Sequence, residues 1–128
     1  MVILDTNIII DHVRKHAKPT AFDKLDEQFK GKTHAISMVT VQELYEGKST
    51  IIKEKEKDIL IIINNLRVLP YTYEVAKLAG QIARDLFHQI DLADAAIAAT
   101  AILNEADLFT LNKKDFIGIN DLRFMNFS

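Results

Sequence analysis

Short hydrophobic runs alternate with longer segments of helical periodicity along this chain of 128 residues. The runs predict buried strands at residues 2–4, 33–37, 67–69 and 107–110, with a last edge strand at 122–124. The longer segments predict helices. One starts at Ile8, the next covers 21–30, and a third is capped by Ser37 or Thr40 and ends at Gly47. Three more cover residues 51–66, 73–88 and 91–103. A break is expected at residues 16–20, which contain Pro19, and a short turn or helix at 112–116.

Strands that are short, lack a polar face and alternate with helices are typical of a parallel sheet covered on both sides. The expected fold is therefore a single α/β domain over residues 1–128, with three layers (α/β/α) around a central, mainly parallel sheet. The run from Ile59 to Ile63 covers more than one face of its predicted helix. We expect another helix, or a second copy of the chain in a homodimer, to cover it.

The segment from Asp91 to Leu103 is the predicted centre of the fold. After its first turn it is small and apolar on every side, which predicts a helix packed all round by other elements. Asp91 is placed to cap this helix and to bond its free amide groups. Asp94 follows one turn later, where a buried charge must be paired or must hold a metal. A capping box between Asp91 and Asp94 is the open alternative.

Other polar residues follow the predicted strands, at the edge where parallel sheets bind their ligands. Asp5 follows the first strand, Glu43 lies in the helix after the second, and Asn112 and Asp115 come after the fourth. Taken singly, Asp5 and Asp115 are expected to be caps and Glu43 a solvated helix residue. Their convergence with Asp94 at one edge favours a shared site instead.

Carboxylates that meet without lysine or arginine between them repel one another unless a cation lies among them. The chain has no cysteine. Its histidines are His12, His16, His34 and His88, and their spacing is not that of metal ligands. Nothing in the sequence brings two of them together for acid–base catalysis. Ligands that are all oxygen suit Mg²⁺ or Mn²⁺ rather than zinc. Such a cation binds a phosphodiester and activates water for attack.

The composition permits, but does not indicate, a nucleic-acid partner. The net charge is −2, yet setting aside the four candidate acids leaves 14 acidic residues against 16 basic ones. The hydrophobic runs fall short of the ~18 residues that a membrane span requires. The N-terminus carries no basic leader, so we expect a cytoplasmic protein without a membrane anchor.

Four blocks, in order along the chain, resemble the PIN-domain ribonucleases, and most of all the VapC-type toxins of prokaryotic toxin–antitoxin pairs. The blocks are Leu4-Asp5-Thr6-Asn7, residues 37–47 around Glu43, residues 94–101 after Asp94, and residues 110–116 from Thr110 to Phe116. The resemblance implies an endoribonuclease that depends on Mg²⁺ or Mn²⁺. It also implies a homodimer, held inactive by a cognate antitoxin that blocks the acidic cleft.

The resemblance assigns roles residue by residue. Asp5 and Asp94 match the principal metal ligands and Glu43 the third acid of the site. The fourth acid falls on Asn112 or Asp115, and the sequence leaves open which of them faces the metal. Small polar residues that orient metal ligands or waters are Thr6, Asn7, Thr110 and Asn112. Basic residues expected to contact RNA phosphates are Arg14, Lys15, Lys113 and Lys114.

Two other functions stay open at this point. The same fold can act as a protein-binding module without catalysis, although a cleft with no activity would gain nothing from crowding Asp5, Glu43 and Asp94. A housekeeping nuclease that processes RNA is the other alternative, since it would need the same acids.

Overall fold

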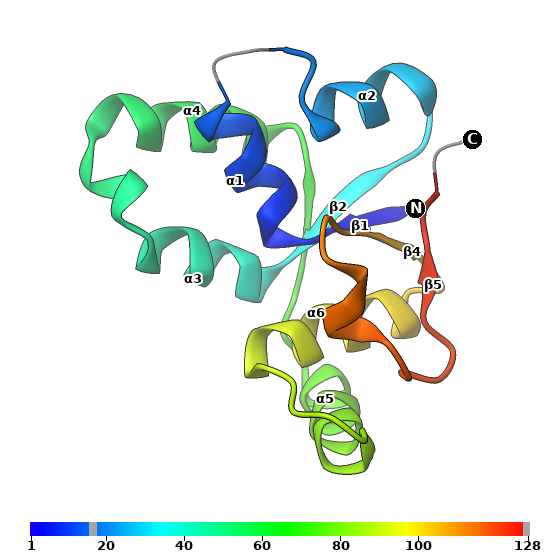
Figure 1. Ribbon diagram of the computed structural model, residues 1–128. Helices are drawn as coiled ribbons and strands as arrows, with labels where there is room; N and C mark the ends of the chain where they lie inside the picture. The colour runs from blue at the N-terminus through cyan, green and yellow to red at the C-terminus, as the bar shows by residue number, and fades with distance from the viewer. Residues whose placement is uncertain (16–17, 127–128) are drawn as a thin grey trace.

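The computed structural model describes residues 1–15 and 18–126, and its centre is a sheet of five parallel strands. The strands are β1 (Val2–Leu4), β2 (His34–Ser37), β3 (Arg67–Leu69), β4 (Asp107–Phe109) and β5 (Arg123–Phe124), in the spatial order β3-β2-β1-β4-β5. Every predicted strand is present, including the edge strand at the end of the chain. The first strand lies in the middle of the sheet, so a residue that follows it reaches the centre of the carboxyl edge (Figure 1).

Helices cover both faces of the sheet (Figure 1). They are α1 (Thr6–Arg14), α2 (Ala21–Gln28), α3 (Met38–Glu46), α4 (Lys53–Asn64), α5 (Tyr73–Asp85) and α6 (Leu92–Leu103), with short 3-10 helices η1 (Lys48–Ile51) and η2 (Lys113–Phe116). In Figure 1, α1, α2 and α4 lie on one side of the strands and α5 and α6 on the other. The three-layer α/β/α expectation is confirmed.

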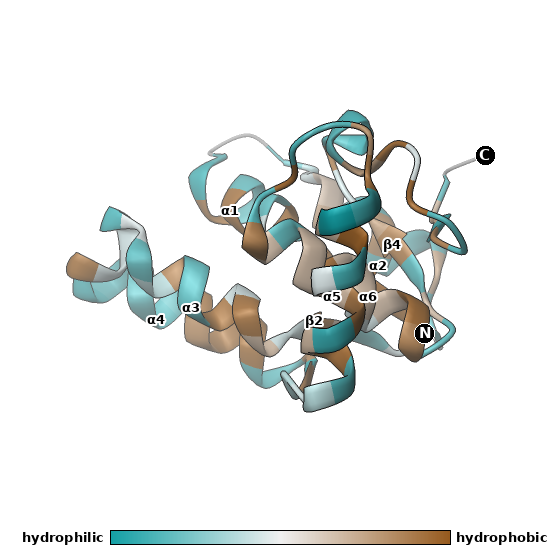
Figure 2. Ribbon diagram, turned by 90° about the horizontal axis from the view of Figure 1, so that it is seen from below, coloured by the Kyte–Doolittle hydropathy of each residue, from teal (hydrophilic) through white to brown (hydrophobic). Residues whose placement is uncertain are grey.

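Alternate residues of β1 supply the two halves of the core, because successive side chains of a strand point to opposite faces. Val2 and Leu4 pack with the α1, α2 and α4 side, whereas Ile3 packs with the α6 side. All three are fully buried. Figure 2 shows hydrophobic and hydrophilic residues alternating along the turns of α1 and α3, as amphipathic helices require.

The boundaries of several helices differ from the expectation. The helix predicted from Ile8 begins at Thr6, and Ser37 rather than Thr40 caps α3, accepting a bond from the Val39 amide. The segment predicted as one helix over 51–66 is the 3-10 helix η1 followed by α4. The helix predicted over 73–88 ends at Asp85. Of the predicted break at 16–20, residues 16 and 17 lie outside the described residues, and 18–20 form no helix.

The segment that follows α5 makes a tertiary contact in place of further helical turns. In this segment, both ring nitrogens of His88 reach carbonyl oxygens, Nδ1 that of Gln89 at 3.0 Å and Nε2 that of Ile117 at 2.8 Å. Ile117 directly follows η2, so the bond joins segments 29 residues apart. A periodicity within residues 73–88 carries no information about such a partner.

Two predicted hydrophobic surfaces are covered only in part. In α6, residues 95–101 are buried as expected, but Leu92 is 72% exposed and Leu103 48%. In α4, Ile59 and Ile62 pack into the core, while Leu60 and Ile61 remain 41% and 54% exposed on this chain. No helix in the described part of the chain is long and apolar enough to cross a membrane.

Candidate functional site

Asp5 stands between β1 and α1, at the centre of the carboxyl edge. Its backbone amide donates to the Phe109 carbonyl of β4 at 2.9 Å, which holds the end of β1 in the sheet. Its carboxylate is 5% exposed and accepts two bonds at 2.7 Å, one from the Thr6 amide and one from the Thr110 hydroxyl. Burial, helped by the charge of Asp115, raises the pKa of Asp5 above its ordinary value, although the bonds from Thr110 and Thr6 act to lower it. Asp5 therefore caps α1, as the simpler expectation held, and is also fixed at the edge.

Glu43 reaches the same edge from α3, which packs beside α1 and α6. The Thr6 hydroxyl donates to its Oε1 at 2.5 Å. Burial raises the pKa of Glu43, the bond from Thr6 lowers it, and the negative charges of Asp5, Glu46 and Asp91 raise it again. A half-buried side chain bonded to another helix is not the solvated residue that the simpler interpretation expected.

Asp94 lies in the first turn of α6 without the partners that a cap would supply. Asp91 is the N-cap residue of α6, as predicted, but its side chain makes no capping hydrogen bond, so the expected bonds to the free amides and the capping box are both absent. The Asp94 carboxylate has no hydrogen bond or ion pair with another residue of the described chain. Burial, followed by the charges of Asp5, Glu43, Asp115 and Asp91, raises the pKa of Asp94 to about 7. Asp94 is thus held among like charges.

The segment after β4 contributes Asp115, with Asn112 as its support. The Asn112 side-chain amide donates to Asp115 Oδ2, and the Asp115 backbone amide donates to the Asn112 carbonyl at 3.2 Å. The negative charge of Asp115 contributes to the raised pKa values of Asp5 and Asp94. Of the two candidates that the sequence left open, Asp115 is therefore the acid near the other carboxylates, and Asn112 orients it.

Asn7 and Thr110 join the start of α1 to the segment after β4. The Asn7 side chain donates to the Thr110 hydroxyl at 3.4 Å and accepts from the Leu111 amide at 3.3 Å. Thr110 also accepts from the Asn112 amide at 3.0 Å while it donates to Asp5. Thr6, Thr110 and Asn112 thus bond directly to the acids, and Asn7 is linked to them through Thr110.

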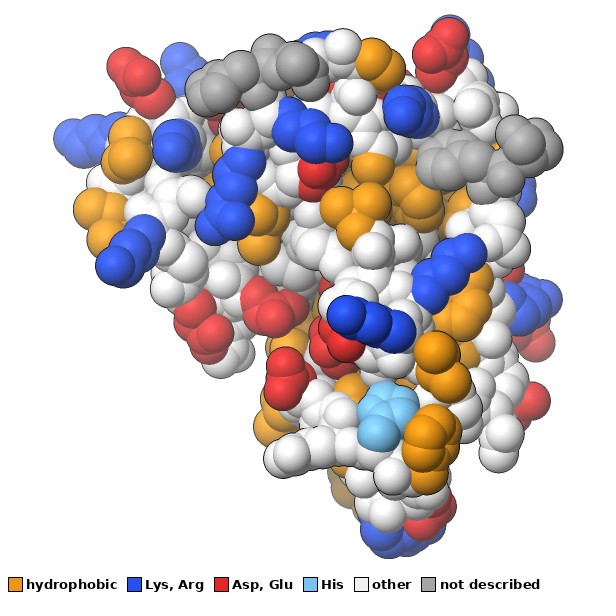
Figure 3. All heavy atoms as spheres, viewed as in Figure 1, with side chains coloured by type: hydrophobic (Ala, Val, Ile, Leu, Met, Phe, Trp, Pro, Cys, Tyr) orange, Lys and Arg blue, Asp and Glu red, His pale blue; other side chains and the backbone are white. Residues whose placement is uncertain are grey.

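The four carboxylates of Asp5, Glu43, Asp94 and Asp115 form an acidic cluster without a basic partner. None of them forms an ion pair with a lysine, arginine or histidine of the described residues. The ion pairs that are present lie elsewhere: His12–Asp23, Lys15–Asp11, Arg84–Asp85 and Arg123–Asp107. Figure 3 shows acidic side chains in the hollow between the part of the molecule that carries α3 and the part that carries α6. A cation bound among them would relieve their mutual repulsion.

The acidic cluster fits a hard divalent cation that keeps part of its water shell. Within the described residues, no three acidic or histidine side chains lie close enough together to hold a metal ion by themselves. Mg²⁺ usually retains several waters and binds through one or two carboxylates, so a complete set of protein ligands is not required. The acids of the cluster form no ion pair with a basic residue of the described chain, and the pKa of Asp94 is raised; both observations agree with such a cation.

The described histidines do not enter the acidic cluster as a pair. Hydrogen bonds with the Gln89 and Ile117 carbonyls raise the pKa of His88, and the charge of Asp115 adds to them. His12 bonds the Thr20 hydroxyl, and burial lowers the pKa of His34. His16 lies outside the described residues.

The four basic residues expected to contact RNA fall into two groups. Arg14 and Lys114 are exposed and form no ion pair within the described residues. Lys15 pairs with Asp11 at 3.2 Å, and Lys113 donates to the side-chain oxygen of Asn126. The latter two would exchange an existing partner for a phosphate.

Two residues near the site did not enter the expectations for it. Thr40 is fully buried in α3, and a 3.0 Å hydrogen bond joins its hydroxyl to that of Thr6. Asp91 adds negative charge beside Glu43 and Asp94. A signal for Thr40 was present, because it precedes Glu43 by three residues and so shares its helix face.

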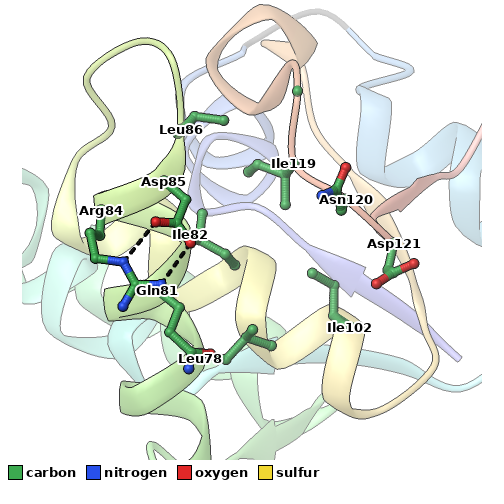
Figure 4. Close-up of a pocket in the computed structure, with 11 residues that line it drawn as sticks. Leu78, Gln81, Ile82, Arg84, Asp85, Leu86, Ile102, Ile119, Asn120 and Asp121 are labelled. Atoms are coloured by element: carbon green, nitrogen blue, oxygen red, sulfur yellow. Dashed lines mark hydrogen bonds and ion pairs between the residues drawn. The ribbon is translucent and has the colours of Figure 1, made fainter.

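A cavity of about 410 Å³ lies outside the acidic cluster. It lies between α5, the second half of α6 and the segment 118–121, with an apolar wall that includes Leu78, Ile82 and Ile102 (Figure 4). The ion pair of Arg84 and Asp85 stands at its side. Asp94 precedes Ile102 by about 12 Å along the α6 axis.

Comparison with known proteins agrees with this geometry. The model of the PIN domain matches residues 2–121. Ribonuclease VapC19 of Mycobacterium tuberculosis is 34% identical over 128 residues, which cover 96% of this chain and 98% of the relative. Ribonuclease VapC10 of the same species is 32% identical over 115 residues, covering 88% and 83%.

Solved structures show the same fold. VapBC2 from Rickettsia felis, bound to a DNA fragment from its promoter, superposes with a TM-score of 0.83 at 25% identity, over 99% of this chain and 98% of that one. DNA-bound VapBC from Salmonella typhimurium gives a TM-score of 0.77 at 25% identity, over 97% and 96%. With a family model over nearly its whole length, relatives of matching length and this acidic edge, the chain belongs to the PIN-domain family.

Proposed function

We propose that this protein is a metal-dependent endoribonuclease and the toxin of a VapBC-type toxin–antitoxin pair. The observation that carries the proposal is the Asp94 carboxylate, which has no hydrogen-bond or ion-pair partner in the described chain and lies among the charges of Asp5, Glu43 and Asp115. A partly buried carboxylate without a partner destabilises the fold unless a ligand binds to it. The relatives named ribonuclease VapC support RNA as the substrate.

In this proposal Asp5 and Asp94 are the principal ligands of Mg²⁺ or Mn²⁺, and Glu43 is the third acid. The bound cation would lower the pKa of a water molecule and polarise the phosphodiester. The remaining steps belong to groups of the chain. Bonds from the Thr6 amide and the Thr110 hydroxyl keep Asp5 in one orientation.

Glu43 is our candidate for the base that accepts a proton from the attacking water. Its Oε1 already accepts the Thr6 hydroxyl, and its pKa is raised by burial, which favours proton uptake. Asp115, oriented by Asn112, supplies the fourth negative charge. Arg14, Lys15, Lys113 and Lys114 are the proposed contacts to RNA phosphates.

A cognate antitoxin and a second copy of the chain are the proposed protein partners. Exposed hydrophobic side chains along η1 and α4 give them a surface to cover: Ile51, Ile52, Leu60 and Ile61. The similar structures include DNA-bound VapBC and a toxin–antitoxin complex from Klebsiella pneumoniae.

Cleavage of RNA by the purified protein tests the proposal. We expect cleavage with Mg²⁺ or Mn²⁺ and none with EDTA, and a loss of at least about 100-fold in Asp5→Asn, because the ligand charge is removed. Asp26→Asn, which changes an exposed aspartate on α2, serves as the matched control and should cleave normally. Cleavage that persists in EDTA, or an Asp5→Asn variant as active as the wild type, would contradict the proposal.

Two outcomes would favour the other functions. A well-folded wild type that cleaves no RNA in either metal would indicate a protein-binding module. An active protein whose production does not arrest growth, with or without a co-expressed antitoxin, would indicate a housekeeping nuclease.

A further inference from the structure

Thr40 is a buried hydroxyl next to the acidic cluster that cannot itself touch a substrate. Its side chain lies in α3 and is fully buried. Its hydrogen-bond partner is the Thr6 hydroxyl in α1, at 3.0 Å. The same Thr6 oxygen lies 2.5 Å from Glu43 Oε1. Thr40 is therefore one bond removed from Glu43.

Counting protons gives this network a direction. A hydroxyl carries one proton, and an ionised carboxylate only accepts. Because Thr6 has the shorter contact with Glu43, its single proton is donated there. Toward Thr40 the Thr6 oxygen must then accept, so Thr40 is the donor. The order is Thr40 to Thr6 to Glu43, and each bond in such a chain strengthens the next.

We propose that Thr40 is a positioning residue for Glu43, a role that rests on the proposed function of the acidic cluster. With the Thr40 proton in place, the Thr6 hydroxyl has one low-energy orientation, and Glu43 Oε1 has a fixed donor. Thr6 also holds Asp5 through its backbone amide. The threonine pair thus sets the relative placement of Asp5, which precedes α1, and Glu43, which lies in α3.

Thr100 shows what a buried threonine does when it has no such role. It is also fully buried, but its hydroxyl donates to the Ala96 carbonyl at 2.7 Å within its own helix. Thr40 instead bonds across to α1. Valine has nearly the shape of threonine, so Thr40→Val and Thr100→Val remove the same atom from equally buried sites. Comparing the two variants separates an effect on the position of Glu43 from a general effect on core packing.

Mn²⁺ affinity, measured by electron paramagnetic resonance of free Mn²⁺, and the kinetics of RNA cleavage are the two readouts. For Thr40→Val we expect Mn²⁺ binding about 10-fold weaker and kcat about 10-fold lower at nearly unchanged KM, the scale seen when a group that orients a ligand is removed. Thr40→Ser keeps the donor and should stay within about 3-fold of the wild type. Thr100→Val should match the wild type in both readouts.

A double-mutant cycle with Glu43→Gln tests whether Thr40 acts through Glu43. In that background, Thr40→Val should produce no further loss of Mn²⁺ affinity. An equal loss with and without Glu43, or wild-type affinity and kcat in Thr40→Val, would overturn the inference. If thermal unfolding shows that Thr40→Val does not fold, Thr40→Ala removes the same donor and answers the same question.

The two proposals fail in different ways. A wild-type protein that neither binds Mn²⁺ nor cleaves RNA removes the proposed function and the role of Thr40 with it. A wild type that does both, beside a Thr40→Val variant that is indistinguishable from it, removes the role of Thr40 alone.

Discussion

The first turns of α2 and α6 share a sequence spacing but differ in their bonds. In each, an aspartate follows the cap residue by three positions, Asp23 after Thr20 and Asp94 after Asp91. At α2 both bonds of a capping box form. The Thr20 hydroxyl accepts from the Asp23 amide at 3.2 Å, and Asp23 Oδ2 accepts from the Thr20 amide at 3.0 Å. At α6 neither bond is present.

The pKa values of the two aspartates accordingly shift in opposite directions. The bond from the Thr20 amide lowers the pKa of Asp23. Burial, with the neighbouring acids, raises the pKa of Asp94 to about 7. A carboxylate at this helix position is normally stabilised by the free amides and the helix dipole. The α6 turn lacks the capping bonds and leaves the Asp94 carboxylate without a partner in the described chain, whereas the α2 turn uses Asp23 in a structural cap.

The largest expected difference between the two turns is in catalysis. Asp94→Asn should lower the rate of RNA cleavage at saturating Mg²⁺ by about 100-fold or more, because it removes a charged ligand of nearly the same shape. Asp23→Asn should stay within about 2-fold, because surface changes outside a site have small effects. Initial rates on one labelled RNA measure both. Similar losses of cleavage rate in Asp94→Asn and Asp23→Asn would show that the two turns do not differ in function.

The second difference is in the pH dependence of stability without metal. The folded-state pKa of Asp94, about 7, exceeds the ordinary value of 3.8, so the folded chain keeps a proton that the unfolded chain has lost. The Asp94 contribution therefore makes the free energy of unfolding fall as pH rises from about 4 to 7. Asp94→Asn should remove this fall and be more stable at pH 8 by about 1–2 kcal/mol, less than the full shift because part of the side chain meets solvent.

Urea unfolding in EDTA at pH 5 and pH 8 measures this effect. The wild type and Asp94→Asn should differ more at pH 8 than at pH 5. Equal differences at the two pH values would show that Asp94 is ionised throughout and lies in a more polar environment than we describe.

The smallest difference concerns the cap of α2. Thr20→Ala should lower the free energy of unfolding by about 1 kcal/mol, the usual value of a lost cap. The lowered pKa of Asp23 means that its contribution is present above pH 3.8 and is lost as pH falls through the folded-state pKa. Asp91→Ala, at the matching position of α6, should not destabilise the metal-free protein, since no capping bond is removed. A comparable loss in both variants at pH 7 would mean that Asp91 does cap its helix in solution.

Local patterns predicted most of the fold because they act within a few residues. The hydrophobic runs of β1 and β4 predict strands whatever the position of these strands in the sheet. The apolar segment 95–101 predicts a buried helix in the same way. The parallel order of the sheet then follows from alternating strands and helices. The predicted elements and the parallel sheet place Asp5, Glu43 and Asp94 at one edge, and this prediction needs no information about their contacts.

Contacts between distant segments decided the rest, because their free energies depend on neighbours that no local pattern contains. The sequence presents Thr20-x-x-Asp23 and Asp91-x-x-Asp94 as equal candidates for a cap. Only the folded chain places other carboxylates beside Asp94 and none of them beside Asp23. It likewise places the charge of Asp115 near Asp5 and Asp94, with Asn112 donating a hydrogen bond to Asp115.

The sequence by itself thus determined the sheet, the layers and the acids available at its carboxyl edge, since these follow from periodicity and residue type. The tertiary structure alone decided which of those acids are satisfied by hydrogen bonds and which stay unpaired. The physical reason is that burial and Coulomb repulsion are sums over all neighbours in space, while capping depends on a single turn.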